Sequence, residues 1–300
     1  MRLVRVLFSL HILALLFGLG GLLIALPHPD VWAASPLAQQ VFTFGVSHGG
    51  ALHILCGAAT MLAFGTYAIG WRRTLVFFVV GTLVPLGAEL TGTATGWPFG
   101  GYSYTEGLGV KVAGRVPYSV PLSWFYMGFA AFLLAAVIVQ TQRRRRRAWL
   151  PIVLGAWLLM AWDLVLDPAM ATPSMPVRFW AWHQSGAYFG MPPRNLVGWF
   201  GTGLAFMTLS RLLWRGMPDL ARIPVWLPYG VYLANVVWAM ALAISVGLWP
   251  AALAALVLGL APATLVWSRE RMAPADHARA GGGAAASRRA TMPERAMVDQ

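Results

Sequence analysis

Two aspartates stand four residues apart in the segment AWDLVLDP, residues 161–168: Asp163 and Asp167. Positions four apart on an α-helix share a face, so both carboxyl groups are expected to point the same way. The segment ends a long apolar run, and a carboxylate inside a bilayer costs at least ~2.5 kcal/mol. A buried carboxyl group with a second acid nearby can hold a proton and donate it, which makes general acid catalysis the favoured interpretation. Satisfying free backbone groups at a helix end before Pro168 explains Asp167 equally well.

Glu89 and His48 complete the candidate catalytic set. Glu89 closes another apolar run, and His48 lies in the segment VSHGGALH. The expected topology brings both to the membrane depth of the two aspartates, on the same side. For His48 the structural alternative is a hydrogen bond between packed helices. His53, on a different helix face, and His11, expected near the opposite membrane surface, are weaker candidates.

The elements that must position these groups are membrane helices. The chain has 300 residues, of which 58% are hydrophobic and 11% charged. An α-helix needs about 20 apolar residues to cross a bilayer. The sequence therefore predicts an all-α, polytopic transmembrane bundle of about eight spans, near residues 6–26, 42–69, 74–91, 118–141, 149–168, 196–214, 224–246 and 249–267. The first apolar run is too long for a signal peptide. We expect one integral-membrane domain over residues 1–270 and a disordered, basic cytoplasmic tail over 271–300.

The net charge of +12 follows the topology rather than a nucleic-acid-binding face. With the N-terminus inside, 18 of the lysines and arginines fall in cytoplasmic segments. The exceptions are Lys111, Arg115, Arg178 and Arg194. This asymmetry predicts a multi-pass protein of the cytoplasmic membrane with both termini inside, and no nucleic-acid partner. The run of five arginines at 143–147 is best explained as a stop-transfer loop.

Two outer loops, near residues 92–117 and 169–195, are rich in glycine, proline and aromatic residues. We expect them to be packed and to wall an apolar pocket, although an aromatic belt at the membrane surface is the simpler explanation for such residues. Neither loop has the lysine of a phosphate-binding loop. The single cysteine, Cys56, excludes an internal disulfide and a cysteine metal cluster. The candidate substrate-binding residues are Thr93, Trp97, Phe99, Tyr102, Tyr104, Trp182, Tyr188 and Asn195.

The segments GTATGWPFGGYSYT, after Glu89, and DLVLDP…WAWHQSGAYFGMPPRNLVGW resemble the membrane-integral carotenoid hydratases of the CruF type. The resemblance covers roughly residues 40–215, with Pro193 and Arg194 departing from a more apolar family pattern. It implies addition of water across the terminal C1,C2 double bond of a linear (ψ) carotenoid end, which gives a tertiary alcohol. Implied substrates are lycopene, γ-carotene or a bisanhydrobacterioruberin-like carotenoid. Implied partners are membrane lipids and other enzymes of carotenoid synthesis, and no cofactor is implied.

The candidate residues suit this chemistry. Asp163 is the expected acid that protonates the less substituted carbon. Asp167 or Glu89, together with His48, is expected to orient and deprotonate the attacking water. The tertiary cation between these steps would lie against aromatic faces, for which the candidates are Trp97, Phe99, Tyr102 and Trp182.

Two alternatives stay open. A metal-dependent membrane enzyme acting on a lipid or isoprenoid could use His48, Glu89 and the two aspartates as ligands. Six histidines scattered along the chain fit the paired histidines of di-iron membrane enzymes poorly. A proton-coupled transporter or lipid-binding protein could use the carboxyl groups as a proton relay, although no internal repeat supports it.

Overall fold

The computed structural model describes residues 1–141, 149–214, 216, 218 and 223–268. Within these residues, eight helices are long and apolar enough to cross a membrane. The predicted all-α class and eight spans are confirmed, while the predicted tail and the 143–147 arginine run lie outside the described residues. The helices are α1 (Arg2–Gly20, continued by a π-helical turn at Gly21–Ala25), α2 (Pro36–Ile69), α3 (Trp71–Thr95), α4 (Ser119–Thr141), α5 (Leu150–Ala171), α6 (Arg194–Leu213), α7 (Trp226–Ser245) and α8 (Trp249–Ala255, continued through a π-helical turn at Leu256–Leu260 to Ser268).

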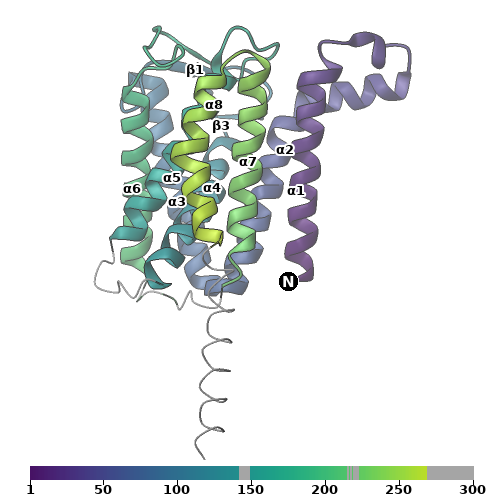
Figure 1. The fold of residues 1–300 in the computed structure, drawn as a ribbon. Coiled ribbons are helices and arrows are strands. Elements are labelled where there is room, and N and C mark those ends of the chain that lie inside the picture. Colours follow the sequence, from purple (N-terminus) through teal and green to yellow (C-terminus); the bar gives the residue numbers. More distant parts are fainter. Residues whose placement is uncertain (142–148, 215, 217, 219–222, 269–300) are drawn as a thin grey trace, which may run out of the picture.

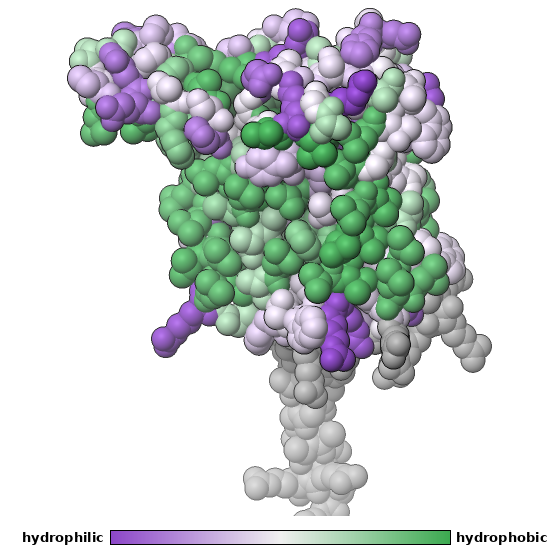
Figure 2. Space-filling view, turned by 180° about the vertical axis from the view of Figure 1, so that it is seen from behind, coloured by the Kyte–Doolittle hydropathy of each residue, from purple (hydrophilic) through white to green (hydrophobic). Residues whose placement is uncertain are grey.

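The eight helices form an upright bundle with the N-terminus and the end of α8 on the same side (Figure 1). On the face shown in Figure 2, an apolar band crosses the middle of the molecule and hydrophilic residues gather at both ends. This distribution matches a multi-pass membrane protein, because side chains facing lipid must be apolar while those at the two water interfaces need not be.

Helix α4 is the most completely enclosed of the eight spans. Its residues 124–127 are Trp, Phe, Tyr and Met, and all are at most 1% exposed. Small residues allow the neighbouring helices to approach closely. A Cβ at Gly128 would lie 2.5 Å from the Phe206 ring, and one at Gly155 would lie 3.0 Å from the Phe132 backbone. The bundle therefore packs around α4, and its neighbours carry the polar residues described below.

The two long loops are packed, as predicted, and form a cap at the end of the bundle opposite the N-terminus (Figure 1). Strand β1 (Tyr102–Tyr104) pairs antiparallel with β4 (Trp180–Trp182). A second pair, β2 (Lys111–Val112) with β3 (Val116–Pro117), stands beside α4. The register sets Tyr102 opposite Trp182 and Tyr104 opposite Trp180, so aromatic side chains from both loops meet in the cap.

The start of α2 and a short 3-10 turn at Pro29–Val31 project sideways from the bundle (Figure 1). Helix α2 begins six residues before the predicted span, at Pro36. Ser35 is its N-cap, with the hydroxyl accepting from the Ala38 amide at 3.4 Å, and proline suits the first helical position. This cap signal, which hydropathy alone overlooks, extends α2 beyond the closely packed bundle.

Candidate active site

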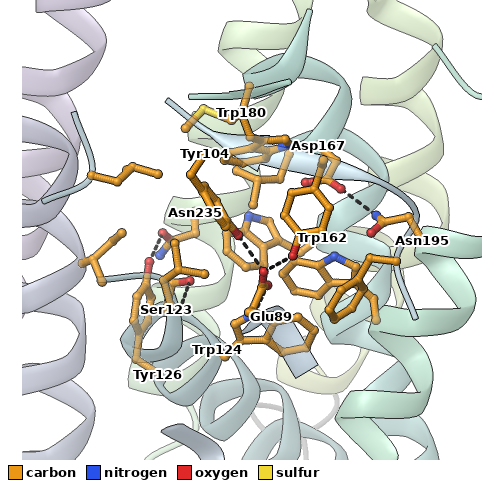
Figure 3. Close-up of a pocket in the computed structure, with 18 of the residues that line it drawn as sticks. Glu89, Tyr104, Ser123, Trp124, Tyr126, Trp162, Asp167, Trp180, Asn195 and Asn235 are labelled. Carbon is orange, nitrogen blue, oxygen red and sulfur yellow. Dashed lines mark hydrogen bonds between the residues drawn. The ribbon is translucent and has the colours of Figure 1, made fainter. Parts of the chain in front are cut away.

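A small cavity lies beneath the β1–β4 cap, among α2 to α7 (Figure 3). Its volume is about 60 Å³, enough for a few water molecules or the end of a longer molecule. Two carboxyl residues, Glu89 from α3 and Asp167 from α5, line it. Six tryptophans form much of the remaining wall: Trp124, Trp162, Trp180, Trp182, Trp199 and Trp238.

Glu89 is held by three donors on one side of this cavity. Its Oε2 accepts from the hydroxyl groups of Tyr102 and Tyr104, the latter at 2.9 Å. Its Oε1 accepts from Trp124 Nε1 at 3.0 Å. Alternate residues of a strand share a face, which is why β1 aims both tyrosines at one carboxyl group. Both oxygens of Glu89 are thus satisfied, and its side chain is 3% exposed.

Burial, together with the neighbouring Glu89, raises the pKa of Tyr102 and that of Tyr104 well above the ordinary value. Ionising either phenol would place a second negative charge beside Glu89 in an apolar site. Both tyrosines therefore stay protonated and remain donors to Glu89 at neutral pH.

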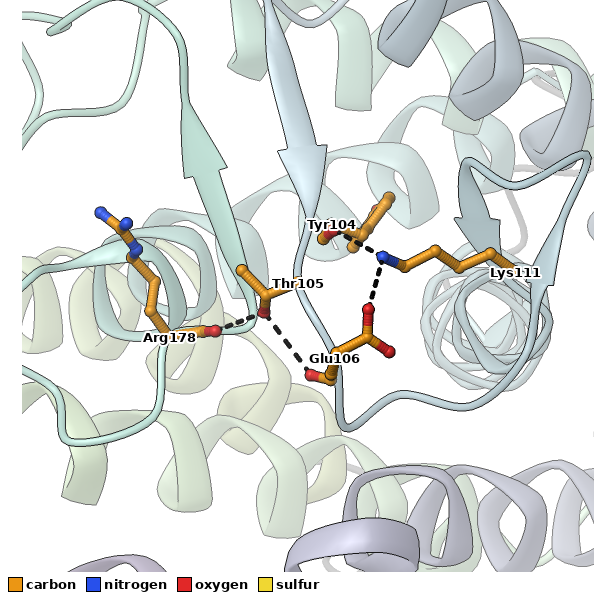
Figure 4. A network of polar contacts seen from close by, with 5 residues as sticks. All are labelled: Tyr104, Thr105, Glu106, Lys111 and Arg178. Carbon is orange, nitrogen blue, oxygen red and sulfur yellow. Dashed lines mark hydrogen bonds and ion pairs between the residues drawn. The ribbon is translucent and has the colours of Figure 1, made fainter.

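A polar network fixes β1 from outside the cavity (Figure 4). Lys111 Nζ donates to the Tyr104 carbonyl at 3.0 Å and pairs with Glu106 Oε1 at 3.1 Å. Thr105 bonds the other loop twice, through its hydroxyl to the Arg178 carbonyl and through its amide to the Phe179 carbonyl. These contacts join the two loops at the residue next to Tyr104.

Asp163 and Asp167 meet a single amide on the opposite side of the site. Asn195 Nδ2, in the first turn of α6, donates to Asp163 Oδ2 at 2.8 Å and to Asp167 Oδ2 at 2.6 Å. The expected shared direction of the two carboxyl groups is confirmed. Helix α5 continues past Pro168 to Ala171, and Asp167 bonds Asn195 rather than free backbone groups at a helix end.

The two aspartates differ in their access to the cavity. Asp167 lines it, whereas Asp163 does not and is 0% exposed. Asp163 Oδ1 is buried and makes no hydrogen bond with any described residue. No lysine or arginine in the described part of the chain forms an ion pair with either one. Asp163 therefore stands behind Asp167, as a second carboxyl group in the apolar interior.

Two indole N–H groups at the cavity have no acceptor among the described residues. Trp162 Nε1 and Trp182 Nε1 are both buried and unpaired. Buried donors are almost always satisfied in folded proteins, so such exceptions in a cavity wall point to a bound partner. A water or hydroxyl oxygen is an acceptor small enough for this space.

His48 does not join the carboxyl groups. It is exposed and stacks on Phe44, with ring centroids 5.0 Å apart, because its face of α2 turns away from the bundle. His53 lines the cavity instead. His11 is fully buried rather than near a membrane surface: its Nδ1 faces the His53 carbonyl at 2.8 Å and its Nε2 faces Asn235 Nδ2 at 3.0 Å. A carbonyl requires a donor and an amide nitrogen an acceptor, which identifies His11 as the neutral Nδ1–H tautomer.

The predicted substrate-binding residues divide into two groups. Trp97 is 63% exposed, the Thr93 hydroxyl donates to the Glu89 carbonyl, and the Tyr188 hydroxyl donates to the Leu164 carbonyl, so these three stay outside the cavity wall. The other five line the cavity: Phe99, Tyr102, Tyr104, Trp182 and Asn195.

The substrate-binding residues predicted from the two loops did not include the tryptophans of the helices that line the cavity. Trp199 follows Asn195 by four positions, so its place on the same helix face was readable from the sequence. It stacks on Trp124, with ring centroids 3.8 Å apart, and meets Trp162 edge-on at 5.9 Å. Trp124 carries no such signal, since its helix is apolar on every face.

Within the described residues, no three histidine, cysteine, aspartate or glutamate side chains form a group that could hold a metal ion. The metal hypothesis required His48 together with the three carboxyl groups. The structure separates His48 from them.

Comparisons with known proteins were made on the whole chain. A family model described as "Carotenoid biosynthesis protein" matches residues 49–262. A bisanhydrobacterioruberin hydratase of Haloarcula japonica is 31% identical over 142 residues, which are 47% of this chain and 46% of that protein. The match thus spans about half the length of the relative. No solved structure matches the chain.

Proposed function

The chain belongs to the carotenoid biosynthesis protein family that contains the CruF-type hydratases, and we propose that it adds water across the terminal C1,C2 double bond of a linear carotenoid end. One observation carries the proposal: the carboxyl group of Asp167, backed by Asp163, opens into a cavity walled by six tryptophans. A proton donor and aromatic faces are what hydration of an unactivated alkene requires.

The first step is proton transfer to the alkene. Two carboxyl groups that share one amide donor in an apolar site cannot both be ionised, so the pair holds a proton. Asp167 donates it to C2, the less substituted carbon, because Asp167 lines the cavity and Asp163 does not. The placement supports Asp167 as the acid, in place of Asp163, which the sequence suggested for this role. Asp163 shares the Asn195 amide with Asp167 and, as the second carboxyl group, keeps one proton on the pair.

The second step is stabilisation of the tertiary cation at C1. Aromatic rings attract a cation through their faces, by roughly 0.5–2 kcal/mol each, with tryptophan the strongest. The stacked Trp124 and Trp199, with Trp162 edge-on to Trp199, form a continuous aromatic wall. Glu89, fixed by its three donors, places a second carboxyl group on the same cavity.

In the third step water attacks C1. The unpaired N–H groups of Trp162 and Trp182 are the donors available to orient its oxygen. The oxygen forms the C1–O bond, and the proton it releases returns to the Asp163–Asp167 pair. Alkene and water are consumed, one tertiary alcohol is formed, and the acid is regenerated without a redox cofactor.

Pigment analysis in a lycopene-producing host tests this function. We expect the unaltered protein to convert lycopene to a more polar, hydroxylated product. Asp167→Asn should lower the yield at least a hundredfold, within the range for a lost general acid, and Asp163→Asn should lower it less. Asp30→Asn, an exposed aspartate outside the cavity, is the matched control and should behave like the unaltered chain.

Two results would contradict the proposal. Folded protein that gives no hydroxylated product from lycopene or γ-carotene would remove the hydratase function and favour the transport alternative. Full activity of Asp167→Asn would show that Asp167 is not the acid that protonates the alkene.

A further inference from the structure

A second and larger cavity opens between the end of α1 and the start of α2. Its volume is about 590 Å³, within the range of ligand-binding pockets. No charged residue lines it, and several of its apolar side chains are exposed, including Leu37 (70%) and Val31 (65%). Since these residues belong to membrane-spanning helices and their connection, we call this cavity the α1–α2 groove.

The α1–α2 groove adjoins the carboxyl cavity. His53, Met170 and Trp238 line both. The rings of His53 and Trp238 lie 5.4 Å apart, and His53 Nδ1 bonds the Gly49 carbonyl at 3.3 Å. These three side chains therefore stand at the junction between a long apolar space and a short polar one.

Three of the glycines that line the groove have open space beside them. A Cβ at Gly20, Gly21 or Gly49 would meet no atom within 4 Å. The glycines of the bundle core differ, since Gly128 and Gly155 lie in tight contact with a neighbouring helix. Gly20 and Gly21 at the end of α1 and Gly49 on α2 thus face space that no described part of the chain fills, whereas Gly45 and Gly50, which also line the groove, lie close to Phe17 and Gly107.

The volumes of the carboxyl cavity and of the groove indicate what shape of ligand would fit them. About 60 Å³ beside the carboxyl groups admits only the end of a molecule, whereas about 590 Å³ of apolar groove admits a long hydrocarbon. A linear carotenoid has this form, with one reacting end and an extended polyene. We infer that the α1–α2 groove binds the polyene chain, which enters sideways from the bilayer and passes His53, Met170 and Trp238 to place its terminal double bond at Asp167.

This inference rests on the proposed function, and its test uses binding as well as turnover. Purified protein in lipid nanodiscs is given lycopene, and bound polyene is measured by its absorption after re-isolation. Gly49→Phe places a ring in open groove space, and Gly21→Phe does so from the opposite wall. Gly87→Phe is the matched control, because Gly87 is exposed on α3, has equally open space and lines neither cavity.

We expect Gly49→Phe and Gly21→Phe to reduce bound lycopene at least tenfold, with Gly87→Phe unchanged. Hydration of a ten-carbon isoprenoid with the same alkene end should persist in all three variants, because that molecule lacks the long polyene that the groove would hold. If the unaltered protein binds lycopene but does not hydrate it, the hydratase function is refuted. Loss of that binding in the two groove variants would still support the groove as the polyene site.

Three outcomes would overturn the inference. Lycopene binding by both folded groove variants equal to that of the unaltered protein would do so. If the groove variants lose hydration of lycopene and of the ten-carbon isoprenoid equally, the substitutions have damaged the carboxyl cavity and not the groove. A phospholipid that remains in the groove and is not displaced by lycopene would make the groove a lipid site.

Discussion

At the scale of single residues, the site divides its polar groups between two carboxyl environments. Glu89 receives three donors, and both of its oxygens are satisfied. The Asp163–Asp167 pair shares one amide and leaves Asp163 Oδ1 without a partner in the described structure. The three donors to Glu89 favour a carboxyl group that stays fixed in place. The Asp163–Asp167 pair has fewer donors, which favours proton transfer. The sequence predicted these acids, but not this division between them.

The indole N–H of Trp162 gives a prediction at this scale. Trp162→Phe keeps an aromatic face and removes only the unpaired donor. A hydrogen bond to water contributes about 1 kcal/mol net, so we expect a roughly fivefold lower hydration rate. Trp162→Leu also removes the face that stabilises the cation and should cost clearly more. Initial rates with lycopene in proteoliposomes measure both. A Trp162→Phe rate equal to that of the unaltered protein would refute a role of the N–H, and equal rates for the two variants would refute a role of the aromatic face.

The tyrosines of β1 predict a dependence of stability on pH. The pKa values of Tyr102 and Tyr104 are raised in the folded protein by burial and by Glu89. Their contribution is therefore complete below the unfolded-state pKa of about 10 and is lost as the pH rises above it. Thermal unfolding in detergent should show stability falling above about pH 10. The double variant Tyr102→Phe, Tyr104→Phe should be less stable at pH 7 and should fall less steeply, and an unchanged slope would contradict this assignment.

At the scale of elements, the cap depends on Lys111 more than on its ion pair. The Glu106 side chain is 92% exposed, and an exposed ion pair contributes about 0–1 kcal/mol. Lys111 also holds the Tyr104 carbonyl. We expect Glu106→Gln to change the hydration rate less than twofold and Lys111→Met to lower it several-fold. Similar effects of the two variants would show that the Tyr104 contact does not matter.

Helix α6 supports the cavity through the close approach of Gly198 to Phe99. A Cβ at Gly198 would lie 2.6 Å from the Phe99 ring and 3.1 Å from the Pro98 carbonyl. Gly198→Ala must therefore displace Phe99, which lines the cavity, and overpacking costs about 1–3 kcal/mol. Gly201→Ala on the same helix meets open space and is the control. We expect a lowered melting temperature and rate for Gly198→Ala alone, measured by thermal unfolding and pigment assay.

Prediction from sequence succeeded where a residue's role depends on its own helix. Hydropathy located the eight spans, and the spacing of four placed Asp163 and Asp167 together. It failed where a role depends on how a helix is turned. His48 and His53 differ by five positions, about 140° around the axis, and hydropathy cannot choose between two faces of a helix that is apolar all round. The groove was equally hidden, because it depends on how α1, α2 and the residues facing them pack in space and not on any one segment alone.

At the scale of the whole molecule, the carboxyl cavity and the groove lie next to each other and differ in chemistry. The groove is apolar and opens between the end of α1 and the start of α2, while the carboxyl cavity is enclosed by α2 to α7 and the cap. A substrate dissolved in the bilayer would never cross the water phase. Water, by contrast, must come from the capped end, where hydrophilic residues gather (Figure 2). The two reactants thus approach the acid from different sides.

The distribution of charge predicts the side of the membrane on which this cap lies. If the segments with 18 cations face the cytoplasm, the N-terminus is inside and the cap lies outside. Cys56 is the single cysteine of the chain, so Cys56→Ser allows one reporter thiol to be placed at will. Exposed Asp30 belongs to the Pro29–Val31 turn, which lies at the end of α1 opposite the N-terminus, and exposed Trp71 begins α3 at the other end of the bundle. In intact cells a membrane-impermeant maleimide should label Asp30→Cys at once and Trp71→Cys only after permeabilisation. The reverse pattern would place the carboxyl cavity in the cytoplasmic half of the membrane, and its water would then come from the cytoplasm.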